Sequence, residues 1–239
     1  MEQTLEAYQA GKTLLVNKPL TWTSFQAVNR IKQNLRKAFD IKKIKVGHAG
    51  TLDPLATGLL LICTGKSTKT IDELQGQEKE YTGTFRLGST TPSFDLETEV
   101  NATFATEHIT DVLLQKAIDQ LTGDIEQTPP IYSALQVDGE RLYKKARRGE
   151  EVDIKKRNVN VREFEVERDG LDLHFRISCS KGTYIRSIAN DIGVFLNSGS
   201  HLTKLCRTRI GNHKLEDAIE LDSFVDELWK AVKNDQKEA

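Results

Sequence analysis

The stretch VGHAGTLDPLATGLLLIC, residues 46–63, joins a glycine-rich loop to an apolar run. The run Leu59–Cys63 is typical of a short buried strand. Before it, Pro54 restricts Asp53 to an extended backbone, while the surrounding glycines permit sharp bends and close approach to a ligand. We therefore expect Asp53 on a stiff loop that leads into a buried strand. An Asp-Pro pair is also a common turn in which the aspartate bonds its own backbone, and the spacing alone leaves this alternative open.

Outward from this stretch, apolar residues follow strand spacing in some segments and helix spacing in others. A strand is predicted over Thr13–Val16, and Thr23 or Ser24 then caps a helix. The apolar positions of that helix are Phe25, Val28, Ile31 and Leu35. The other predicted elements are an exposed alternating strand over Lys79–Leu87, a helix over Ile109–Leu121, a hairpin of Val159–Val166 and Leu171–Cys179 that turns at Asp169-Gly170, a helix over Tyr184–Leu196, and a short acidic helix after Leu221. This mixture predicts an α+β or mixed α/β fold with a largely antiparallel sheet, in a single domain, because no linker rich in Pro, Gly or Ser divides the chain.

The composition is that of an ordinary globular protein, since 38% of the 239 residues are hydrophobic and 29% are charged. The longest apolar run is too short to span a membrane, and the acidic start does not resemble a signal peptide. Cys63, Cys179 and Cys206 are widely spaced and form no C-x-x-C pair, so neither a disulfide framework nor a zinc knuckle is indicated. These features predict a protein of the reducing cytoplasm.

Charge is unevenly distributed along the chain. The net charge of −1 argues weakly against a nucleic-acid partner. Basic residues nevertheless gather in three segments, Val28–His48, Arg141–Arg157 and Arg176–Arg209, while acidic residues concentrate in Ser93–Glu126 and after Asn212. One such run is often no more than a solvated face, but three together favour a positively charged surface.

The sequence lacks the motifs of several classes of enzyme. Gly65-Lys66-Ser67 is not a phosphate loop, because that motif needs a glycine where the chain has Leu60. No serine stands in a G-x-S-x-G sequence, which argues against a serine hydrolase of that type. The five histidines form no pair at i, i+4 and have no cysteine at ligand spacing, so no metal site is predicted.

Five segments, in the same order along the chain, resemble blocks of the TruB family, the bacterial tRNA pseudouridine-55 synthases. They are NKPLTWTS (17–24), GHAGTLDPLATG (47–58), KEYTGTFRLG (79–88), PPIYSALQVDGERLYKKARRG (129–149) and CSKGTYIRSIANDIG (179–193). Five ordered blocks are far more specific than any one motif, and the resemblance covers most of residues 13–211. It implies the pseudouridine synthase fold. It also implies an RNA isomerase that detaches the uracil of uridine 55, turns it and rejoins it through carbon, with no metal or organic cofactor.

The resemblance assigns three catalytic residues. Asp53 matches the catalytic aspartate, which acts either as a nucleophile on the sugar or the ring, or as a charge stabiliser. Arg186 matches the arginine that pairs with this aspartate, although a mid-helix arginine is otherwise usually a surface residue. Tyr81 matches the tyrosine that stacks on the target base and is proposed to help remove the C5 proton. Tyr81 can also be interpreted as an aromatic residue that packs across strands. A neutral phenol is a weak base at pH 7, so the stacking role is better supported than the role in proton removal.

Further residues match positions that contact RNA in the family. The resemblance implies that the target uridine is flipped out of the T loop of tRNA and that His48 fills the vacated space. The segment around residues 127–150 matches an RNA-clasping insertion that tends to order on binding. The implied RNA-binding residues are Lys18, His48, Tyr132, Arg141, Arg147, Tyr184, Leu205 and Arg207. We expect a monomer that binds the T stem-loop of tRNA. We expect it not to bind a membrane.

The chain departs from the family pattern at three places. Thr21 stands where a glycine is frequent, and Leu205 is followed by Cys206 and only then by Arg207, which removes one expected phosphate contact. The residues after Gly211 are too few and too acidic for the small β-rich RNA-binding domain of many relatives, so none is expected. Two alternatives to the tRNA isomerase remain. One is a non-catalytic RNA-binding or tRNA-folding protein on the same scaffold, and the other is an isomerase aimed at ribosomal RNA.

Overall fold

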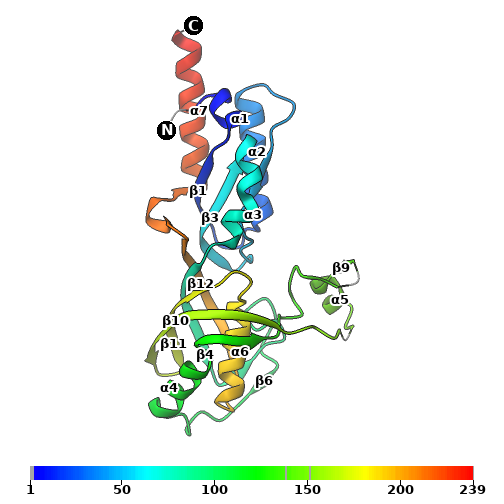
Figure 1. Cartoon of the computed structure of the whole chain (residues 1–239), viewed down its shortest axis with the longest axis vertical. Coiled ribbons are helices and arrows are strands. Elements are labelled where there is room, and N and C mark those ends of the chain that lie inside the picture. The colour runs from blue at the N-terminus through cyan, green and yellow to red at the C-terminus, as the bar shows by residue number, and fades with distance from the viewer. Residues whose placement is uncertain (1–2, 138, 151, 239) are drawn as a thin grey trace. The chain divides into compact units, whose positions relative to one another are not determined.

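The computed structural model describes residues 3–137, 139–150 and 152–238, and the side chains of these residues up to 234. The chain forms two compact units. The first unit comprises the residues up to Glu80 together with those from Cys206 onward, and the second unit comprises Tyr81–Leu205. Two strands, β4 and β12, contain the boundary residues and so contribute to both units (Figure 1).

The first unit is built on the order β14-β1-β3-β12, with β2 paired to β3 and β13 paired to β12. Its helices are α1 (Leu5–Ala10), α2 (Ser24–Ala38), η1 (Gly65–Thr70), α3 (Ile71–Gly76), η2 (Leu215–Asp217) and α7 (Leu221–Glu238). Its strands are β1 (Thr13–Lys18), β2 (Val46–His48), β3 (Ala56–Thr64), β13 (His213–Lys214), β14 (Ile219–Glu220), the start of β4 (Lys79–Leu87) and the end of β12 (Ser200–Ile210). The β1–β14 pair is parallel and the β1–β3 pair antiparallel, so the sheet is mixed.

Helix α2 begins where the sequence predicts. Thr23 is its N-cap, and a capping box links the Thr23 and Gln26 side chains to each other's backbone. Val28, Ile31 and Leu35 are buried, as predicted, because they lie on one helical face. The prediction was wrong for Phe25, which is 67% exposed because it lies beside the buried face of the helix, formed at this end by Ser24, Ala27 and Val28.

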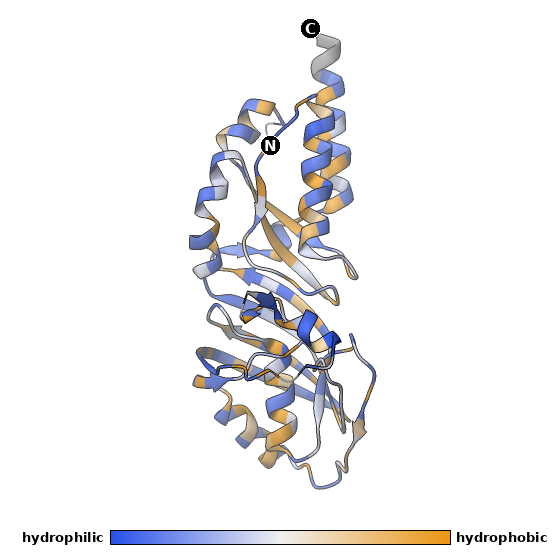
Figure 2. Ribbon diagram, turned by 90° about the vertical axis from the view of Figure 1, so that its right-hand side faces the viewer, coloured by the Kyte–Doolittle hydropathy of each residue, from blue (hydrophilic) through white to orange (hydrophobic). Residues whose placement is uncertain are grey.

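The C-terminal helix also differs from the prediction. Helix α7 is not short but has 18 residues, and it contacts α2. Its buried side chains recur at helical spacing: Leu221, Phe224, Val225, Leu228 and Val232. The acidic residues of this segment concealed an apolar stripe, and the stripe stabilises the helix against α2. Figure 2 shows the resulting interleaving of hydrophobic and hydrophilic residues along the helices.

The second unit follows the order β12-β4-β11-β10-β7. Its further strands and helices are β5 (Ser89–Thr90), β6 (Ala102–Thr103), α4 (Asp111–Gln120), β7 (Gly123–Gln127), β8 (Gln136–Val137), β9 (Glu140–Arg141), α5 (Leu142–Arg147), β10 (Arg157–Asp169), β11 (Asp172–Cys179) and α6 (Ile185–Phe195). The predicted hairpin is confirmed, because β10 and β11 pair antiparallel with Asp169 opposite Asp172. Helices α4 and α6 match the predicted helices to within two residues at each end.

Strand β4 is more buried than the prediction for Lys79–Leu87 implies, although Glu80–Gly83 are half-buried and Arg86 is exposed. Thr84, Phe85 and Leu87 are buried, and Phe85 stacks on Phe175 of β11 with the ring centroids 4.1 Å apart. A strand with neighbours on both sides loses its exposed face when helices and loops cover it, and the alternating pattern alone does not reveal that cover.

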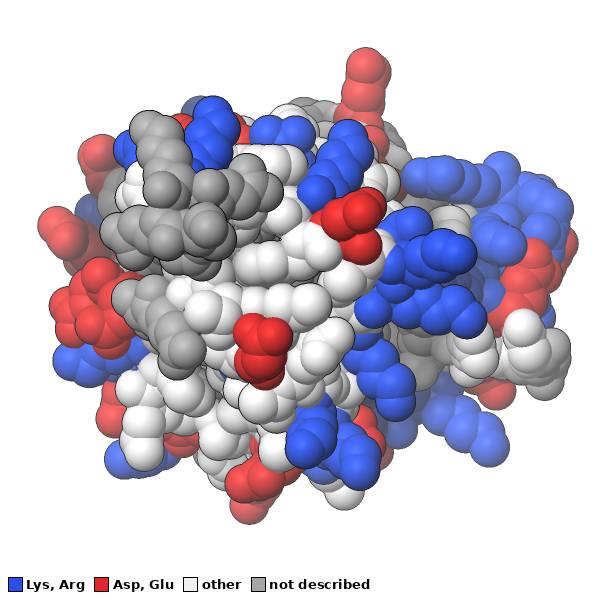
Figure 3. All heavy atoms as spheres, turned by 90° about the horizontal axis from the view of Figure 1, so that it is seen from above, with Lys and Arg blue, Asp and Glu red and all other residues white. Residues whose placement is uncertain are grey.

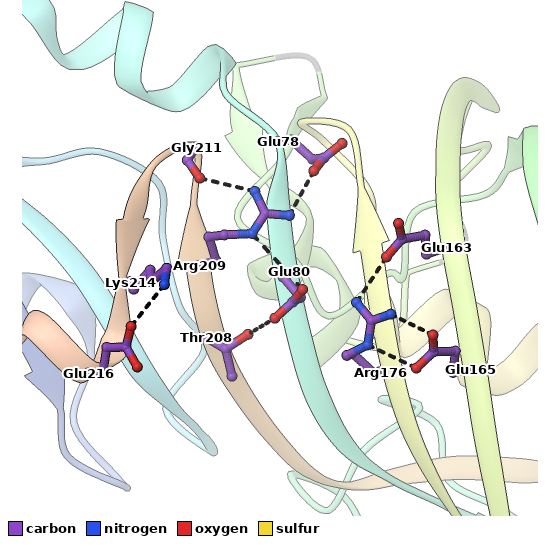
Figure 4. Close-up of polar contacts among 10 residues, drawn as sticks. All are labelled: Glu78, Glu80, Glu163, Glu165, Arg176, Thr208, Arg209, Gly211, Lys214 and Glu216. Carbon is purple, nitrogen blue, oxygen red and sulfur yellow. Dashed lines mark hydrogen bonds and ion pairs between the residues drawn. The ribbon is translucent and has the colours of Figure 1, made fainter.

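Ion pairs within each unit neutralise many of its arginines (Figure 4). In the second unit, Arg176 donates to Glu165 through Nε and Nη2 at 2.9 and 2.6 Å, and to Glu163 at 2.9 Å. In the first unit, Arg209 lies 2.8 Å from Glu78 and 4.0 Å from Glu80. The positive surface predicted from the three basic segments is therefore reduced where arginines have acidic neighbours.

Candidate active site

The loop that carries Asp53 runs from the end of β2 to the start of β3, in the first unit. Its backbone is held from outside by Thr21 and by Ser24, the first residue of α2. The hydroxyl of Ser24 accepts a bond from the Leu52 amide at 2.8 Å and lies 3.1 Å from the Leu52 carbonyl, to which it donates. The Thr21 amide donates to the Pro54 carbonyl at 2.8 Å. Asp53 itself is half-buried between these two anchors, so its position is fixed by its neighbours in sequence.

Arg207 holds the same loop from the opposite direction. It is 1% exposed, and its guanidinium donates to the carbonyls of Leu59 at 2.8 Å, Gly50 at 3.1 Å and Thr51 at 3.4 Å. The guanidinium of Arg207 therefore donates its hydrogen bonds to backbone carbonyls inside the first unit. The resemblance implied an RNA-binding role for Arg207, whereas this structure gives it the contacts of a residue that positions the Asp53 loop.

Gly58 allows β3 and β12 to approach closely beside this loop. Its φ is 102°, and a Cβ atom there would lie 2.4 Å from the Arg207 carbonyl oxygen and 2.6 Å from the Arg207 nitrogen. Only glycine tolerates both that backbone conformation and that contact. Thr21 adopts the left-handed conformation as well, with φ 68°, so the family's frequent glycine at this position has a backbone reason.

Lys18 is a buried amine in the same unit as Asp53. Its Nζ donates to the carbonyls of Trp22 at 2.6 Å and Pro19 at 2.9 Å. Burial lowers the pKa of Lys18 to about 8, although the negative charge of Asp53 acts in the opposite direction. Lys18 therefore belongs to the electrostatic surroundings of Asp53, and its contact with RNA stays a prediction.

His48 ends β2, a few residues before Asp53. Burial, followed by the positive charge of Arg207, lowers the pKa of His48 below its ordinary value of 6.5. The imidazole is therefore neutral at pH 7, which suits an aromatic ring that contacts bases better than a charged one that contacts phosphates.

Arg186 lies on α6 in the second unit and is almost completely buried. Its Nη1 donates to the carbonyls of Tyr132 at 2.8 Å and Ser93 at 3.3 Å, and its Nε lies 3.5 Å from a carboxylate oxygen of Asp95. Asp95, which the sequence did not single out, is itself buried. The guanidinium is thus held in a defined orientation. Because Arg186 and Asp53 belong to different units, their pairing stays a prediction.

Tyr184 is the N-cap of α6 and is held by the side-chain amide of Gln127. The Tyr184 amide donates to Gln127 Oε1 at 2.8 Å, and Gln127 Nε2 donates to the Tyr184 carbonyl at 3.1 Å. The guanidinium of Arg157 lies 4.9 Å from the centre of the Tyr184 ring. Tyr81 and Leu205 also lie in the second unit, where both are partly buried against its main hydrophobic core. These three candidates for the base pocket therefore share one unit.

The segment around residues 127–150, apart from residue 138, forms the β8–β9 hairpin and α5. Leu142 is its buried anchor, and the Leu142 amide donates to the Leu135 carbonyl at 2.8 Å. Arg141 is exposed, and Tyr132 is half-buried. Arg147 is 65% exposed in its side chain, stands 5.5 Å from the Tyr143 ring and pairs with Glu97 at 3.3 Å. An RNA phosphate would compete with Glu97 for this arginine.

The predicted site residues thus fall into two groups. Asp53, Lys18, His48 and Arg207 share the first unit, and Tyr81, Tyr132, Arg141, Arg147, Tyr184, Arg186 and Leu205 share the second. Sequence reasoning missed Ser24, Gln127 and Asp95, which orient these residues. Ser24 was predicted only as one of two possible caps of the helix, a role that Thr23 takes, whereas nothing local indicated Gln127 or Asp95.

The described residues contain neither a metal-ion cluster nor a membrane-spanning helix. Among them, no three His, Cys, Asp or Glu side chains are grouped so that they could hold a metal ion. No helix in the described part of the chain has the length and apolar character needed to cross a membrane.

Comparisons with known proteins agree on one family. Residues 36–185 match the model of the TruB family pseudouridylate synthase N-terminal domain. The chain is 57% identical over 227 residues to tRNA pseudouridine synthase B of Flavobacterium johnsoniae, which covers 94% of this chain and 99% of that protein. It is 53% identical over 218 residues to the protein of the same name from Phocaeicola vulgatus, covering 91% and 93%.

Solved structures with the same fold come from larger proteins. A Cbf5-Nop10-Gar1 complex contains a chain with a TM-score of 0.67 and 27% identity, and an H/ACA RNP bound to a substrate RNA containing 2'-deoxyuridine contains one with 0.66 and 26%. These matches cover 94% and 96% of this chain, which spans 60% of each of those chains. The predicted fold class is confirmed. The family match and the curated relatives together show that the chain belongs to the TruB family of pseudouridylate synthases and is an isomerase.

Proposed function

We propose that this protein converts uridine 55 in the T loop of tRNA to pseudouridine, with Asp53 as the catalytic carboxylate. The curated relatives that cover nearly the whole chain carry the name tRNA pseudouridine synthase B, which supports tRNA as the substrate. The observation that carries the proposal is the Asp53 loop, whose backbone is held by Ser24, Thr21 and Arg207. A carboxylate that must meet one carbon atom of its substrate needs such a fixed backbone.

The reaction balances without a co-reactant. The N1–C1′ bond of uridine breaks, the uracil turns, a C5–C1′ bond forms, the C5 proton leaves and N1 gains a proton. An ionised Asp53 can attack the sugar or the ring, or stabilise positive charge at C1′, and each path needs an oriented carboxylate. We propose that Arg186 orients it, supported by the fixed guanidinium that Ser93 and Tyr132 hold.

The remaining residues receive roles in binding. We propose that the target nucleotide is flipped out of its stack, which costs a few kcal/mol. Stacking on Tyr81 returns about 1–3 kcal/mol, and Tyr184 and Leu205 complete the pocket around the base. The neutral imidazole of His48 is suited to filling the space in the RNA that the flipped uracil leaves. Both units together form the catalytic domain, and the protein acts as a cytoplasmic monomer.

The segment around residues 127–150 is proposed to clasp the RNA. Its basic side chains, Arg141 and Arg147 among them, are exposed, and Leu142 anchors it to its own short hairpin. Tyr132 provides an aromatic ring at its base, and its carbonyl contacts Arg186. Closure of this segment on RNA would thus involve a residue that also touches the proposed catalytic arginine.

The proposal is tested by incubating the protein with unmodified tRNA and mapping pseudouridine. We expect product at position 55 with the wild type and none with Asp53→Asn, because the amide cannot act as a carboxylate. tRNA binding and the melting temperature of Asp53→Asn should stay close to those of the wild type. Product at another position would contradict the T-loop assignment, and full activity of Asp53→Asn would contradict the catalytic role. Retained tRNA binding without any wild-type product would favour a non-catalytic RNA-binding protein.

A further inference from the structure

A group of exposed basic residues lies in the first unit, outside the site described above. It consists of Arg36 and Lys37 at the end of α2, Lys42, Lys43 and Lys45 in the segment that follows, and Lys66 and Lys69 in η1; we refer to these seven as the lysine surface. The two segments that carry these residues meet where the Gly65 amide donates to the Lys45 carbonyl at 2.9 Å. Lys66 and Lys69 project to the same side of η1, since residues three apart eclipse in a 3-10 helix.

None of these seven basic residues has an acidic partner within 4.0 Å among the described residues. Several arginines and lysines elsewhere are paired, among them Arg86 with Asp172, Lys156 with Glu126 and Arg176 with Glu163. The acidic residues of the neighbouring segments are Asp40, Asp72, Glu73 and, on α1, Glu6, so the positive charge is in excess. Figure 3 shows many lysine and arginine side chains on the face it views. The surface is thus positive in a protein whose net charge is −1.

The helix dipole explains only part of this charge. Cations at the end of α2 are favourable because its last carbonyls carry partial negative charge, which accounts for Arg36 and Lys37. Lys42, Lys43 and Lys45 follow the helix, and Lys66 and Lys69 lie on η1, which continues directly into α3. These five lysines therefore need another explanation.

The surface has the character of a phosphate-binding face rather than a protein interface. The large exposed hydrophobic side chains of the described residues lie elsewhere in the chain, and none falls within residues 36–45 or 65–70. Protein interfaces have an apolar or aromatic centre, whereas nucleic-acid backbones are bound by exposed lysines and arginines.

The lysine surface lies at the far end of β3 from Asp53. Asp53 comes three residues before the start of β3, and η1 follows its last residue, Thr64. A nine-residue strand spans roughly 25 Å, so a polyanion that meets both regions must extend over at least that length. We propose that the lysine surface binds phosphates of the tRNA body, roughly 25 Å from the target nucleotide. This inference rests on the proposed tRNA substrate.

The test compares two variants that lose the same charge. The first is Lys43→Gln, Lys66→Gln and Lys69→Gln combined, and the control is Lys116→Gln, Lys230→Gln and Lys233→Gln, three exposed lysines on α4 and α7. Binding is measured over a salt series with whole tRNA and with a short hairpin limited to the T loop and its closing base pairs. Pseudouridine formation on both RNAs is measured in parallel.

We expect the first variant to bind whole tRNA about tenfold more weakly at low salt. The slope of its plot of log K against log salt should be shallower by about 2, because each lost phosphate contact removes about 0.7–0.9 from that slope. Its binding of the short hairpin, and both binding reactions of the control variant, should match the wild type. Equal weakening on the hairpin, or no weakening on whole tRNA, would overturn the inference. These outcomes are separate from the proposed function, whose failure is the absence of pseudouridine with the wild type on either RNA.

Discussion

At the scale of single residues, Arg207 connects the fold to the proposed chemistry. Its buried guanidinium contacts the carbonyls of Gly50 and Thr51, and so restrains the backbone immediately before Asp53. A lysine cannot replace it, because one ammonium group cannot reach three carbonyls in a planar arrangement. The positive charge also lowers the pKa values of Lys18 and His48. Arg207 is therefore a positioning residue, and its charge can be followed through the pKa values of Lys18 and His48.

Arg207→Met should lower the single-turnover rate by about 100-fold, since a displacement of about 1 Å at a reacting group has that effect. The Kd for tRNA should change less than threefold. The pKa of His48, followed by NMR, should rise because a nearby positive charge has been removed. A weaker Kd with a shallower salt dependence would instead indicate a phosphate contact. An unchanged rate per folded molecule would indicate a purely structural role.

Lys18 should make stability depend on pH. In the unfolded chain Lys18 keeps its proton to about pH 10.5, whereas in the folded protein its pKa is about 8. Between these values the unfolded chain binds more protons, so the free energy of unfolding should increase as pH rises. We expect this increase between pH 8 and 9.5 in denaturant titrations, and a smaller one in Lys18→Met. Tyr8 and Cys63, whose pKa values are raised by burial, act in the opposite direction as pH rises, so the quantity to compare is the difference between the wild type and Lys18→Met.

At the scale of secondary-structure elements, β3 organises the first unit. It pairs with β1 from Cys63 to Gly58 and with β2 from Thr64 to Ile62, so one apolar strand holds both the segment before α2 and the segment before Asp53. Its start depends on Gly58, where the chain passes against the backbone of Arg207. The sequence therefore predicts that β3 is buried, but it does not predict how closely β3 approaches the backbone of Arg207.

Gly58→Ala should destabilise the protein by more than about 2 kcal/mol, because the new methyl group would meet backbone atoms at a positive φ. Gly76→Ala is the matched control, since a Cβ there has no atom within 4 Å. It should change stability by no more than about 1 kcal/mol, in the stabilising direction at a helical position. Denaturant unfolding of both variants checks this. Similar losses in the two variants would contradict the contact at Gly58.

At the scale of the whole molecule, β4 and β12 carry residues of both units, so each unit shares strands with the other. Each unit also has its own thiol reporter. Cys63 is buried in the first unit and Cys179 in the second, whereas Cys206 is only partly buried. Burial also raises the pKa of the Cys63 thiol, which slows its reaction further.

We expect Ellman's reagent to modify one thiol of the native protein, Cys206, and all three after unfolding. In Cys206→Ser, peptide mapping at increasing urea should show Cys63 and Cys179 becoming reactive at the same concentration, because unzipping a shared strand disrupts both units. Clearly separated midpoints would show that the units unfold independently. A native protein with two or more fast thiols would contradict the burial of Cys63 and Cys179.

The sequence by itself determined the local elements and the family. The cap at Thr23, the apolar run of β3 and the turn at Gly170 follow from short-range spacing and backbone preferences, and ordered motifs identified Asp53, Tyr81 and Arg186 as candidates. Tertiary structure alone decided what holds them. Arg207 reaches Gly50 across 157 positions, and Arg186 meets the carbonyl of Ser93 across 93. Such contacts depend on which strands pair and what covers them, and neither is encoded in the spacing of neighbouring residues.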